Sequence, residues 1–181
     1  WVELNEDRWR PAFVGRISVV EPPGTYTVVL KAGEHELRQT LEVLKDPSSE
    51  GSEADIRTQT EMVRTLRDEL NTVADSINRI EWIRRQLEDL QAVAEDLGND
   101  AAAIVSSAQE LDGTFVALEE KLVQLRITGT GQDRVRWPMR VAGRVAYLAS
   151  AVAVADFPPT DQHREVHEVL KTRYAEYQRE L

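Results

Sequence analysis

The stretch that decides the fold runs from residue 63 to residue 97 and reads VRTLRDELNTVADSINRIEWIRRQLEDLQAVAEDL. Apolar residues recur in it at spacings of three and four, which is the period of an α-helix with one buried face. No proline or glycine interrupts residues 52–97, so the pattern predicts a single helix of roughly 65–70 Å at 1.5 Å per residue. The residues predicted to point inward are Val63, Leu66, Leu70, Val73, Ile77, Ile80, Ile83, Leu87, Leu90, Ala94 and Leu97.

Both ends of this helix carry recognisable signals. Residues 52–55, Ser-Glu-Ala-Asp, contain the serine and the acidic residue of an N-terminal capping box. Gly98-Asn99 predicts a left-handed C-terminal cap. Between the ends, the apolar positions 77, 80 and 83 are spaced by three and three, which predicts a local overwinding of the heptad pattern.

Three further helices are predicted after the first. The second, about Asp100–Arg126, has unbroken 4-3-4-3 spacing, and its short connection to the first helix predicts an antiparallel return. Trp137-Pro138 starts a third helix to about Ala155, which is apolar on nearly every side and is therefore expected to sit innermost. Thr160 caps a fourth helix that runs to the end of the chain. The residues predicted to point inward are Ile104, Ala108, Leu111, Phe115, Leu118, Leu122 and Leu125 in the second helix, and Val166, Leu170, Tyr174, Tyr177 and Leu181 in the fourth.

The residues before position 46 have a different period. β-Branched and aromatic residues nearly alternate in Val14–Val20, Thr25–Ala32 and His35–Leu44, which predicts three short strands. Gly33 lies between the last two and favours a hairpin there. Three strands leave one face wet and both edges open, so we expect the missing strands upstream or in a partner.

The predicted class is therefore α+β, mainly α. Residues 1–45 form the end of a β-domain, residues 46–51 are a linker by composition, and residues 46–181 form an antiparallel helical hairpin within a four-helix domain. The first two helices are longer than the last two, so the tip of the hairpin exposes part of its apolar stripe unless something covers it. Large exposed apolar patches usually mark interaction surfaces, and we expect a protein partner or a second copy of the chain at this tip.

The composition excludes several classes of function. The 181 residues include 32 acidic and 22 basic side chains and no cysteine. Nine of the ten net negative charges belong to residues 46–181, which hold 25 acidic and 16 basic side chains. A surplus of carboxylates repels phosphate backbones and anionic lipid head groups, which argues against nucleic-acid and membrane-surface roles. The lack of cysteine excludes disulfides, thiolate catalysis and cysteine-ligated metal sites.

Two features of length bear on the context of the chain. The longest apolar run, residues 145–155, has 11 residues, whereas a membrane-spanning helix needs about 20. The chain opens on Trp1 with neither methionine nor a signal peptide. We therefore expect no membrane span, and we expect the chain to be a piece of a longer protein.

His163 and His167 are the candidate metal ligands. Their i, i+4 spacing on the fourth predicted helix places both imidazoles on one face, as helical metal sites require, and Glu165 is nearby. However, the zinc-protease arrangement has glutamate directly after the first histidine, where this chain has Arg164, and no third ligand is evident. A solvated helix face is the favoured interpretation, and we assign no metal and no cofactor.

Acidic pairs are candidates for catalytic residues, and a glycine-containing loop is a candidate for a phosphate-binding element. Paired carboxylates serve hydrolysis when burial keeps one of them protonated, but all four pairs lie outside the apolar stripes and are predicted to be solvated. The loop Thr128–Gln132 lacks the Lys-Ser/Thr and the preceding strand of a phosphate-binding loop. The four acidic pairs are Asp68-Glu69, Glu88-Asp89, Glu95-Asp96 and Glu119-Glu120.

Cationic and aromatic residues meet at Trp82, Arg84 and Arg85. They predict either a patch for an acidic partner or a carbohydrate, or a structural role in which Arg84 pairs with a carboxylate on a neighbouring helix. We favour the structural role, because Arg84 sits where the heptad pattern falters. Trp137 is predicted to be a packing plug at the start of the third helix.

Five segments are similar, in type and order, to a known family. They are Pro23–Leu30, Gln39–Val43 and Asp46-Pro47 in the β-part, and Ile83–Leu87 and Asp156–Gln162 in the helical part. Together they resemble the C-terminal region of bacterial sortilin-like, BNR-repeat (Asp-box) β-propeller proteins, which are often labelled glycosyl hydrolases or photosystem-stability-factor-like. The likeness runs from about residue 15 to the end of the chain.

This resemblance implies the last strands of an immunoglobulin-like or fibronectin-like β-sandwich followed by a helical hairpin, in a secreted or periplasmic protein. The Ser-x-Asp-x-Gly-x-Thr-Trp motif of the family's propeller repeats does not occur here, so the part on which a hydrolase label would rest is missing. Relatives continue past the fourth helix to an Asn-containing end, whereas this chain stops at residues 179–181.

The predicted function is a non-catalytic accessory module of a larger protein, packing against upstream domains and mediating protein–protein contact. One alternative is a part of a glycoside-hydrolase-type enzyme whose active site lies in an upstream propeller, which requires buried carboxylates facing a cleft. Another is a coiled-coil scaffold that forms homodimers, which predicts concentration-dependent association.

Overall fold

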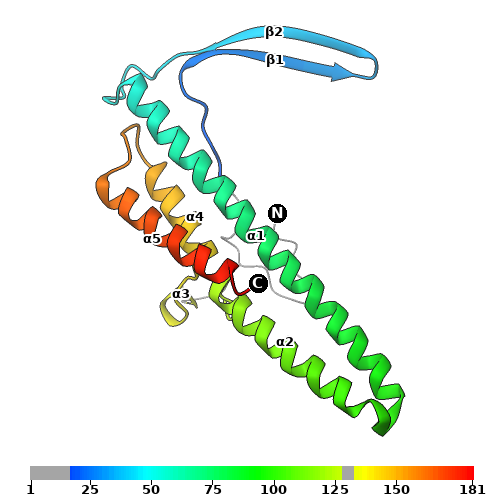
Figure 1. The fold of residues 1–181 in the computed structure, drawn as a ribbon. Coiled ribbons are helices and arrows are strands. Elements are labelled where there is room, and N and C mark those ends of the chain that lie inside the picture. Colours follow the sequence, from blue (N-terminus) through cyan, green and yellow to red (C-terminus); the bar gives the residue numbers. More distant parts are fainter. Residues whose placement is uncertain (1–16, 128–132) are drawn as a thin grey trace.

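The computed structural model describes residues 17–127 and 133–181 and has the predicted class, α+β and mainly α. A two-stranded antiparallel sheet stands at one end of a long helical hairpin, and two shorter helices flank part of that hairpin (Figure 1). The elements, in chain order, are β1 (Gly24–Ala32), β2 (His35–Val43), α1 (Glu53–Asp96), the 3-10 turn η1 (Gly98–Ala101), α2 (Ala102–Leu122), the one-turn helix α3 (Asp133–Arg136), α4 (Val141–Val152) and α5 (Asp161–Gln178).

The β-hairpin has the predicted turn. β1 and β2 pair in register from Gly24 opposite Val43 to Ala32 opposite His35. Gly33 has φ of 60°, a left-handed conformation that glycine adopts without steric cost. The second and third predicted strands are therefore confirmed.

The first predicted strand, Val14–Val20, is wrong in its described part. Residues 17–20 form no strand, and the rest lies outside the described residues. The side chains do alternate, because Ile17 and Val19 pack against the helical core while Val20 is exposed. The period-2 pattern is present, but this segment lies along helix α1 instead of pairing with a strand, and a ladder needs a strand partner.

Helix α1 has the predicted ends. The Asp55 N–H donates to Ser52 Oγ at 3.1 Å, and the Ser52 N–H donates to Asp55 Oδ2 at 3.0 Å, which completes the capping box. Gly98, just after the helix, has φ of 72°. With 44 residues, α1 is about 66 Å long.

The predicted inward residues of α1 are confirmed as buried from Val63 to Ile80, and the inward face departs from the prediction beyond that point. Arg84 is buried and Ile83 only half-buried, so the inward positions 77, 80, 84 and 87 keep regular spacings of three and four. The apolar residues show a 3-3 step at Ile83 because Arg84, a polar residue, occupies the position there in the seam between α1 and α2. A pattern built from apolar residues alone does not include it. Further along, Ala94 is buried, whereas Leu90 and Leu97 are 46% and 67% exposed.

Helix α2 shows the same shift. Between residues 101 and 115 its buried and half-buried residues repeat every three or four positions, and the apolar residues Ile104 and Leu111 lie beside this seam, 47% and 46% exposed. The helix ends at Leu122, short of the predicted Arg126, because Val123 is extended and the Gln124 side chain binds the Pro138 carbonyl. The seam positions of α2 are Ala101, Val105, Ala108, Asp112, Phe115, Glu119 and Leu122.

The third long helix, α4, begins at Val141 and not at Trp137. The residue before a proline disfavours helical backbone, and the chain passes Pro138 without regular structure before α4 starts. Its predicted end, Ala155, is also too late, since α4 stops at Val152. One side of α4 is exposed, with Tyr147 66% accessible, so the helix is not fully enclosed.

Helix α5 is capped by Thr160 as predicted. Leu170 is buried, and Tyr174, Tyr177 and Leu181 pack against the core. Val166, however, is 48% exposed, so its predicted inward position is wrong. His163 and His167 are the partly buried residues of the first two turns.

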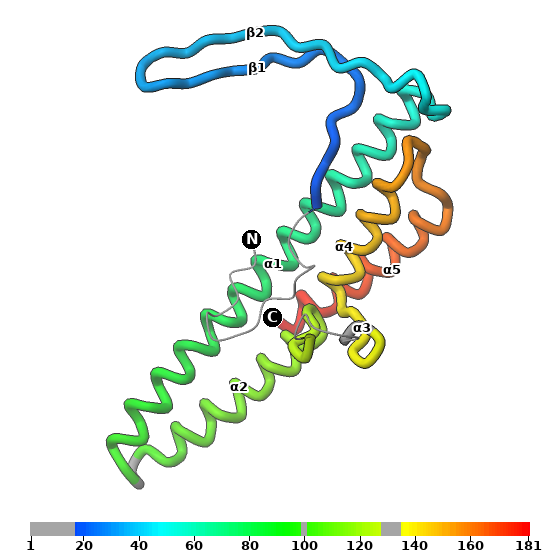
Figure 2. The backbone as a smooth tube through the Cα atoms, turned by 180° about the vertical axis from the view of Figure 1, so that it is seen from behind, coloured from blue at the N-terminus to red at the C-terminus, as the bar shows by residue number. Residues whose placement is uncertain are grey.

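The hydrophobic core occupies only one half of the α1/α2 hairpin. Its members on α1 extend from Met62 to Ile80, and α2 contributes Leu118 and Leu122 together with residues of α4 and α5. We call this half the base. The other half, residues 86–113, which we call the tip, stands clear of α4 and α5 when viewed from both sides (Figures 1 and 2).

Candidate functional site

The β-hairpin has one apolar face and one polar face. Residues directly opposite in the register share a face, so Tyr26 and Leu41 lie with Leu30 and Leu37 and with Val28, whose partner Gln39 is the polar member of this set. The other face carries the pairs Thr27–Thr40, Val29–Arg38 and Lys31–Glu36. We call the first set, Tyr26, Val28, Leu30, Leu37 and Leu41, the hairpin face.

Nothing in the described part of the chain covers the hairpin face. Val28, Leu30, Leu37 and Leu41 are each about half exposed or more, and in Figure 1 the sheet projects away from the helices. The attachments to the helical body come from the segment before β1, where Glu21 pairs with Arg64 and the Thr60 hydroxyl donates to the Val20 carbonyl at 3.4 Å. The hairpin therefore presents an unpartnered amphipathic sheet.

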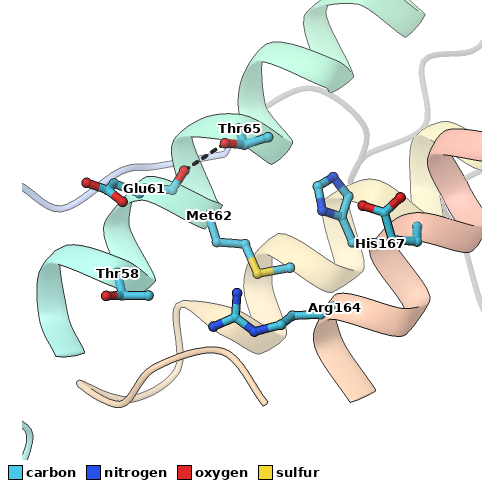
Figure 3. Close-up of a pocket in the computed structure, with 7 residues that line it drawn as sticks. Thr58, Glu61, Met62, Thr65, Arg164 and His167 are labelled. Carbon is cyan, nitrogen blue, oxygen red and sulfur yellow. Dashed lines mark hydrogen bonds between the residues drawn. The ribbon is translucent and has the colours of Figure 1, made fainter. Parts of the chain in front are cut away.

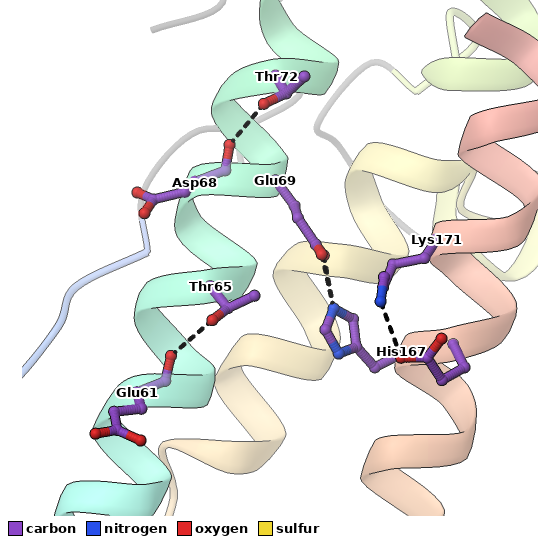
Figure 4. Close-up of polar contacts among 8 residues, drawn as sticks. Glu61, Thr65, Asp68, Glu69, Thr72, His167 and Lys171 are labelled. Atoms are coloured by element: carbon purple, nitrogen blue, oxygen red, sulfur yellow. Dashed lines mark hydrogen bonds and ion pairs between the residues drawn. The ribbon is translucent and has the colours of Figure 1, made fainter.

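The two candidate metal ligands each make contacts within the protein. His163 Nδ1 accepts the Thr160 N–H at 3.3 Å and so completes the cap of α5. His167 Nε2 lies 2.9 and 2.8 Å from the two carboxylate oxygens of Glu69 on α1 (Figure 4). A carboxylate can only accept, so the imidazole donates. No cluster of three or more metal-ligating side chains occurs within residues 17–127 and 133–181.

A pocket of about 350 Å³ lies between α1 and α5 beside His167 (Figure 3). Its charged groups have both signs, since Arg164 faces it together with Glu61 and Glu168. Glu168 is held by Lys171 at 3.0 Å, and this hydrogen bond and charge raise the pKa of the Lys171 ammonium. The lining residues are Thr58, Glu61, Met62, Thr65, Arg164, His167 and Glu168.

Arg84 forms a buried charge network between the two long helices, as predicted. Its Nε donates to Asp112 Oδ1 at 2.7 Å and its Nη1 donates to Glu119 Oε2 at 2.9 Å. Burial lowers the Arg84 pKa, but the hydrogen bonds and charges of the two carboxylates outweigh it and raise the pKa above its ordinary value. Arg84 is thus a structural residue and not part of an exposed cationic patch, while the neighbouring Trp82 is 71% exposed.

One member of the acidic pairs contradicts the prediction of solvated faces. Glu119 is fully buried, because it occupies a seam position opposite Arg84. The described side chains of the pairs at 88–89 and 95–96 are exposed as predicted. Glu69 is also drawn in, by His167.

Other predicted elements have simple positions. Trp137 is half-buried, and its ring stacks with the Arg126 guanidinium at 4.8 Å. The loop Thr128–Gln132 lies outside the described residues.

The apolar pattern of the sequence does not identify Asp112 and Glu69 as contacting residues. The available signal was the heptad phase, because Asp112 is one heptad before Glu119 and both lie opposite the polar residue in the α1 stripe. Glu69 had no such signal, since its partner His167 is 98 residues away in the chain.

The tip of the helical hairpin has the strongest charge asymmetry in the chain. Residues 86–120, which comprise the tip and the next seven residues of α2, contain nine Asp or Glu, seven of them in the tip, and no Lys or Arg. The next basic side chains are Arg85 at one end and Lys121 at the other. Glu88, Asp89, Glu95, Asp96 and Glu110 are all exposed, so the tip combines a negative field with the half-exposed apolar residues described above.

Among the described residues, the helices are all too short or too polar to cross a membrane. Comparison with known proteins finds no family model, no curated protein and no solved structure that matches this chain. The two surfaces that remain as candidates for function are therefore argued from their own geometry: the hairpin face and the tip.

Proposed function

We propose that this chain is a non-catalytic accessory module of a larger β-propeller-type protein that acts outside the cytoplasm. In this proposal the hairpin face docks on further β-strands of that protein, and the helical body forms an arm for protein contacts. The observation that carries the proposal is the unpartnered apolar face of β1 and β2.

The physical argument is the cost of leaving this face in water. A two-stranded hairpin alone is marginally stable, and each half-exposed Val or Leu leaves unrealised part of the roughly 1.5–3 kcal/mol that full burial provides. An antiparallel sheet with one apolar and one polar face is typical of a layer that packs against a second sheet. The polar pairs on the opposite face, such as Lys31–Glu36 at 3.3 Å, suit that arrangement because they remain solvated.

The family resemblance of residues 23–47 supports the same assignment, since it implies the last strands of a sandwich. The hydrolase alternative has less support. Acid–base carboxylates are tuned by burial, whereas Glu61 and Glu168 in the pocket are exposed and Glu168 pairs with Lys171. The buried carboxylates of the described residues are Glu81 and Glu119, and Glu119 pairs with Arg84.

Amide hydrogen exchange of the hairpin tests the proposal. We expect fast exchange of β1 and β2 in the 181-residue chain alone, and strong protection of the same amides in the whole protein. Val28→Asp, on the hairpin face, should remove this protection, whereas Val29→Asp is the matched control. Val28 and Val29 are neighbours with similar exposure on opposite faces.

Equal exchange rates of the hairpin in both contexts would contradict the proposal, as would equal effects of the two variants. The reading frame before Trp1 gives an independent check. Propeller repeats there support the parent protein that we propose, and an initiator methionine immediately before Trp1 excludes it.

A further inference from the structure

The exposed apolar residues of the tip continue the face that α5 covers in the base. On α1, Glu69 and Ser76 bind His167 and Tyr174 of α5, the latter at 2.7 Å. Steps of seven residues keep the same position relative to the seam, and two more heptads from Ser76 lead to Ile83 and Leu90. Leu97 follows one heptad later, so these three residues point to the side on which α5 lies.

Helix α2 contributes to the same side. Leu111 and Ile104 lie one and two heptads before Leu118, which is buried in the core. In the next turn, the Lys121 ammonium stacks on the Tyr177 ring of α5 at 5.4 Å. We call Ile83, Leu90, Leu97, Ile104 and Leu111 the tip face; Ile83, at the border with the base, is half-buried, and the other four are exposed.

The seam itself explains why this apolar set remains outside. Small residues, Ala94, Ala101 and Ala108, are buried there, so α1 and α2 contact each other without using the larger side chains. The tip face is therefore spare apolar surface. In the base the equivalent positions hold Glu69 and Ser76, whose polar groups bind α5, and the buried Leu118 of α2.

We propose that the tip face binds a cationic amphipathic helix of a partner protein. Such a helix would lie on α1 and α2 in line with α5, placing its apolar side on the tip face and its Lys and Arg residues near the exposed carboxylates. From Ile83 to Leu97 the face spans about 21 Å at 1.5 Å per residue, which corresponds to a partner helix of about 14 residues. This inference does not rest on the docking of the β-hairpin.

Charge decides between a basic partner and a second copy of the chain. Two tips placed face to face would oppose seven carboxylates with seven others, with no Lys or Arg in either tip. Like charges across an interface cost several kcal/mol and suppress the wrong partner. A helix that is positive and apolar meets both features of the surface at once.

The probe is a synthetic 18-residue peptide of Leu and Lys, with Leu at helical a, d and e positions, titrated into the 181-residue protein by fluorescence anisotropy. We expect binding that weakens as salt rises, because exposed charges are screened, and no binding of the matching Leu and Glu peptide. Leu90→Ser/Leu97→Ser should weaken binding by about tenfold or more. Val166→Ser/Val169→Ser on α5 is the control, since these valines are similarly exposed and lie outside the tip face.

A second pair of variants isolates the charge. Glu95→Gln/Asp96→Asn should weaken binding and flatten its salt dependence, whereas Glu165→Gln/Glu176→Gln, exposed acids on α5, should change neither. Circular dichroism of each variant confirms that the helices are intact.

The proposal is overturned if the Lys peptide does not bind, if the control variants weaken binding as much as the tip variants, or if the Glu peptide binds equally well. Sedimentation equilibrium provides the remaining outcome. A dimer that Leu90→Ser/Leu97→Ser abolishes would assign the tip face to a second copy and would also overturn the proposal.

Discussion

The base and the tip of the α1/α2 hairpin are built on one continuous heptad seam, yet they differ in cover and in charge. In the base, α4 and α5 close the stripe beside the seam, and Leu66, Ile77 and Ile80 are fully buried. In the tip the corresponding stripe is open. Residues 53–85 carry seven acidic and six basic side chains, whereas residues 86–120 carry nine and none. One long helix therefore contributes to the core at one end and, in our proposal, to a recognition surface at the other.

The boundary between these halves is the Arg84–Asp112–Glu119 network. Beyond it the core contains no large aliphatic side chain among the described residues of α1. Removing one partner of a buried ion pair leaves an uncompensated charge, whereas replacing the whole set by apolar groups is often neutral. We therefore expect substitutions in this network to have the largest effect on the free energy of unfolding.

We expect Arg84→Met to lower the free energy of unfolding by about 3–5 kcal/mol, measured by urea denaturation. The cause is Glu119, which is 0% exposed and would lose its guanidinium partner. The triple variant Arg84→Met/Asp112→Asn/Glu119→Leu should recover most of the stability. A loss below about 1 kcal/mol in the single variant would show that the network does not hold the two helices together.

Deletion of one large side chain in each half compares their packing directly. Leu66→Ala in the base should cost about 2–5 kcal/mol, because Leu66 is fully enclosed and leaves a cavity. Leu97→Ala in the tip, at an exposed position, should stay within about 0.5 kcal/mol. Thermal unfolding followed by circular dichroism measures both. Similar losses would mean that the tip face is covered in the isolated chain.

Substitutions at two glycines are expected to change the stability in opposite directions. A Cβ on Gly51 would lie 1.7 Å from the Asp156 carbonyl oxygen, so Gly51→Ala must move the α4–α5 connection away from the start of α1 and should cost about 1–3 kcal/mol. Gly113 in α2 has open space around it, so Gly113→Ala should stabilise the tip by about 0.5–1 kcal/mol. Chemical denaturation resolves the opposite signs, and equal signs would contradict the described backbone contacts.

A further modest effect is expected at the capping box that starts α1. Ser52→Ala should cost about 1 kcal/mol. The Ser52 hydroxyl and backbone N–H, in that order, hold the pKa of Asp55 below its ordinary value of 3.8. A carboxyl with a lowered folded pKa contributes stability above its unfolded pKa and loses it as the pH falls through the folded pKa. In Tm measurements from pH 6 to pH 2.5, Asp55→Asn should therefore decline less steeply below about pH 4 than the parent chain, and an unchanged slope would contradict this.

Local patterns were sufficient for much of the fold. Ser52 with Asp55 predicts the start of α1, Gly98 its end and Gly33 the β-turn, because capping and positive φ depend on a few neighbouring residues. Patterns failed where contact depends on distant residues. The apolar pattern predicts that Val166 points inward. His167 takes the inward position instead, because its imidazole binds Glu69 of α1 across the helix interface.

The sequence by itself determined the helical hairpin, its antiparallel return, the β-hairpin and the acidity of the helical part, since each follows from spacing, turn chemistry or composition. Only the tertiary structure decided the phase of the seam. The apolar count favours Ile83, Leu90, Ile104 and Leu111 as inward, but Arg84 pairs with carboxylates 28 and 35 residues away. That pairing turns α1 and α2 so that alanines meet in the tip and the larger apolar residues face out, because a buried guanidinium must keep its partners.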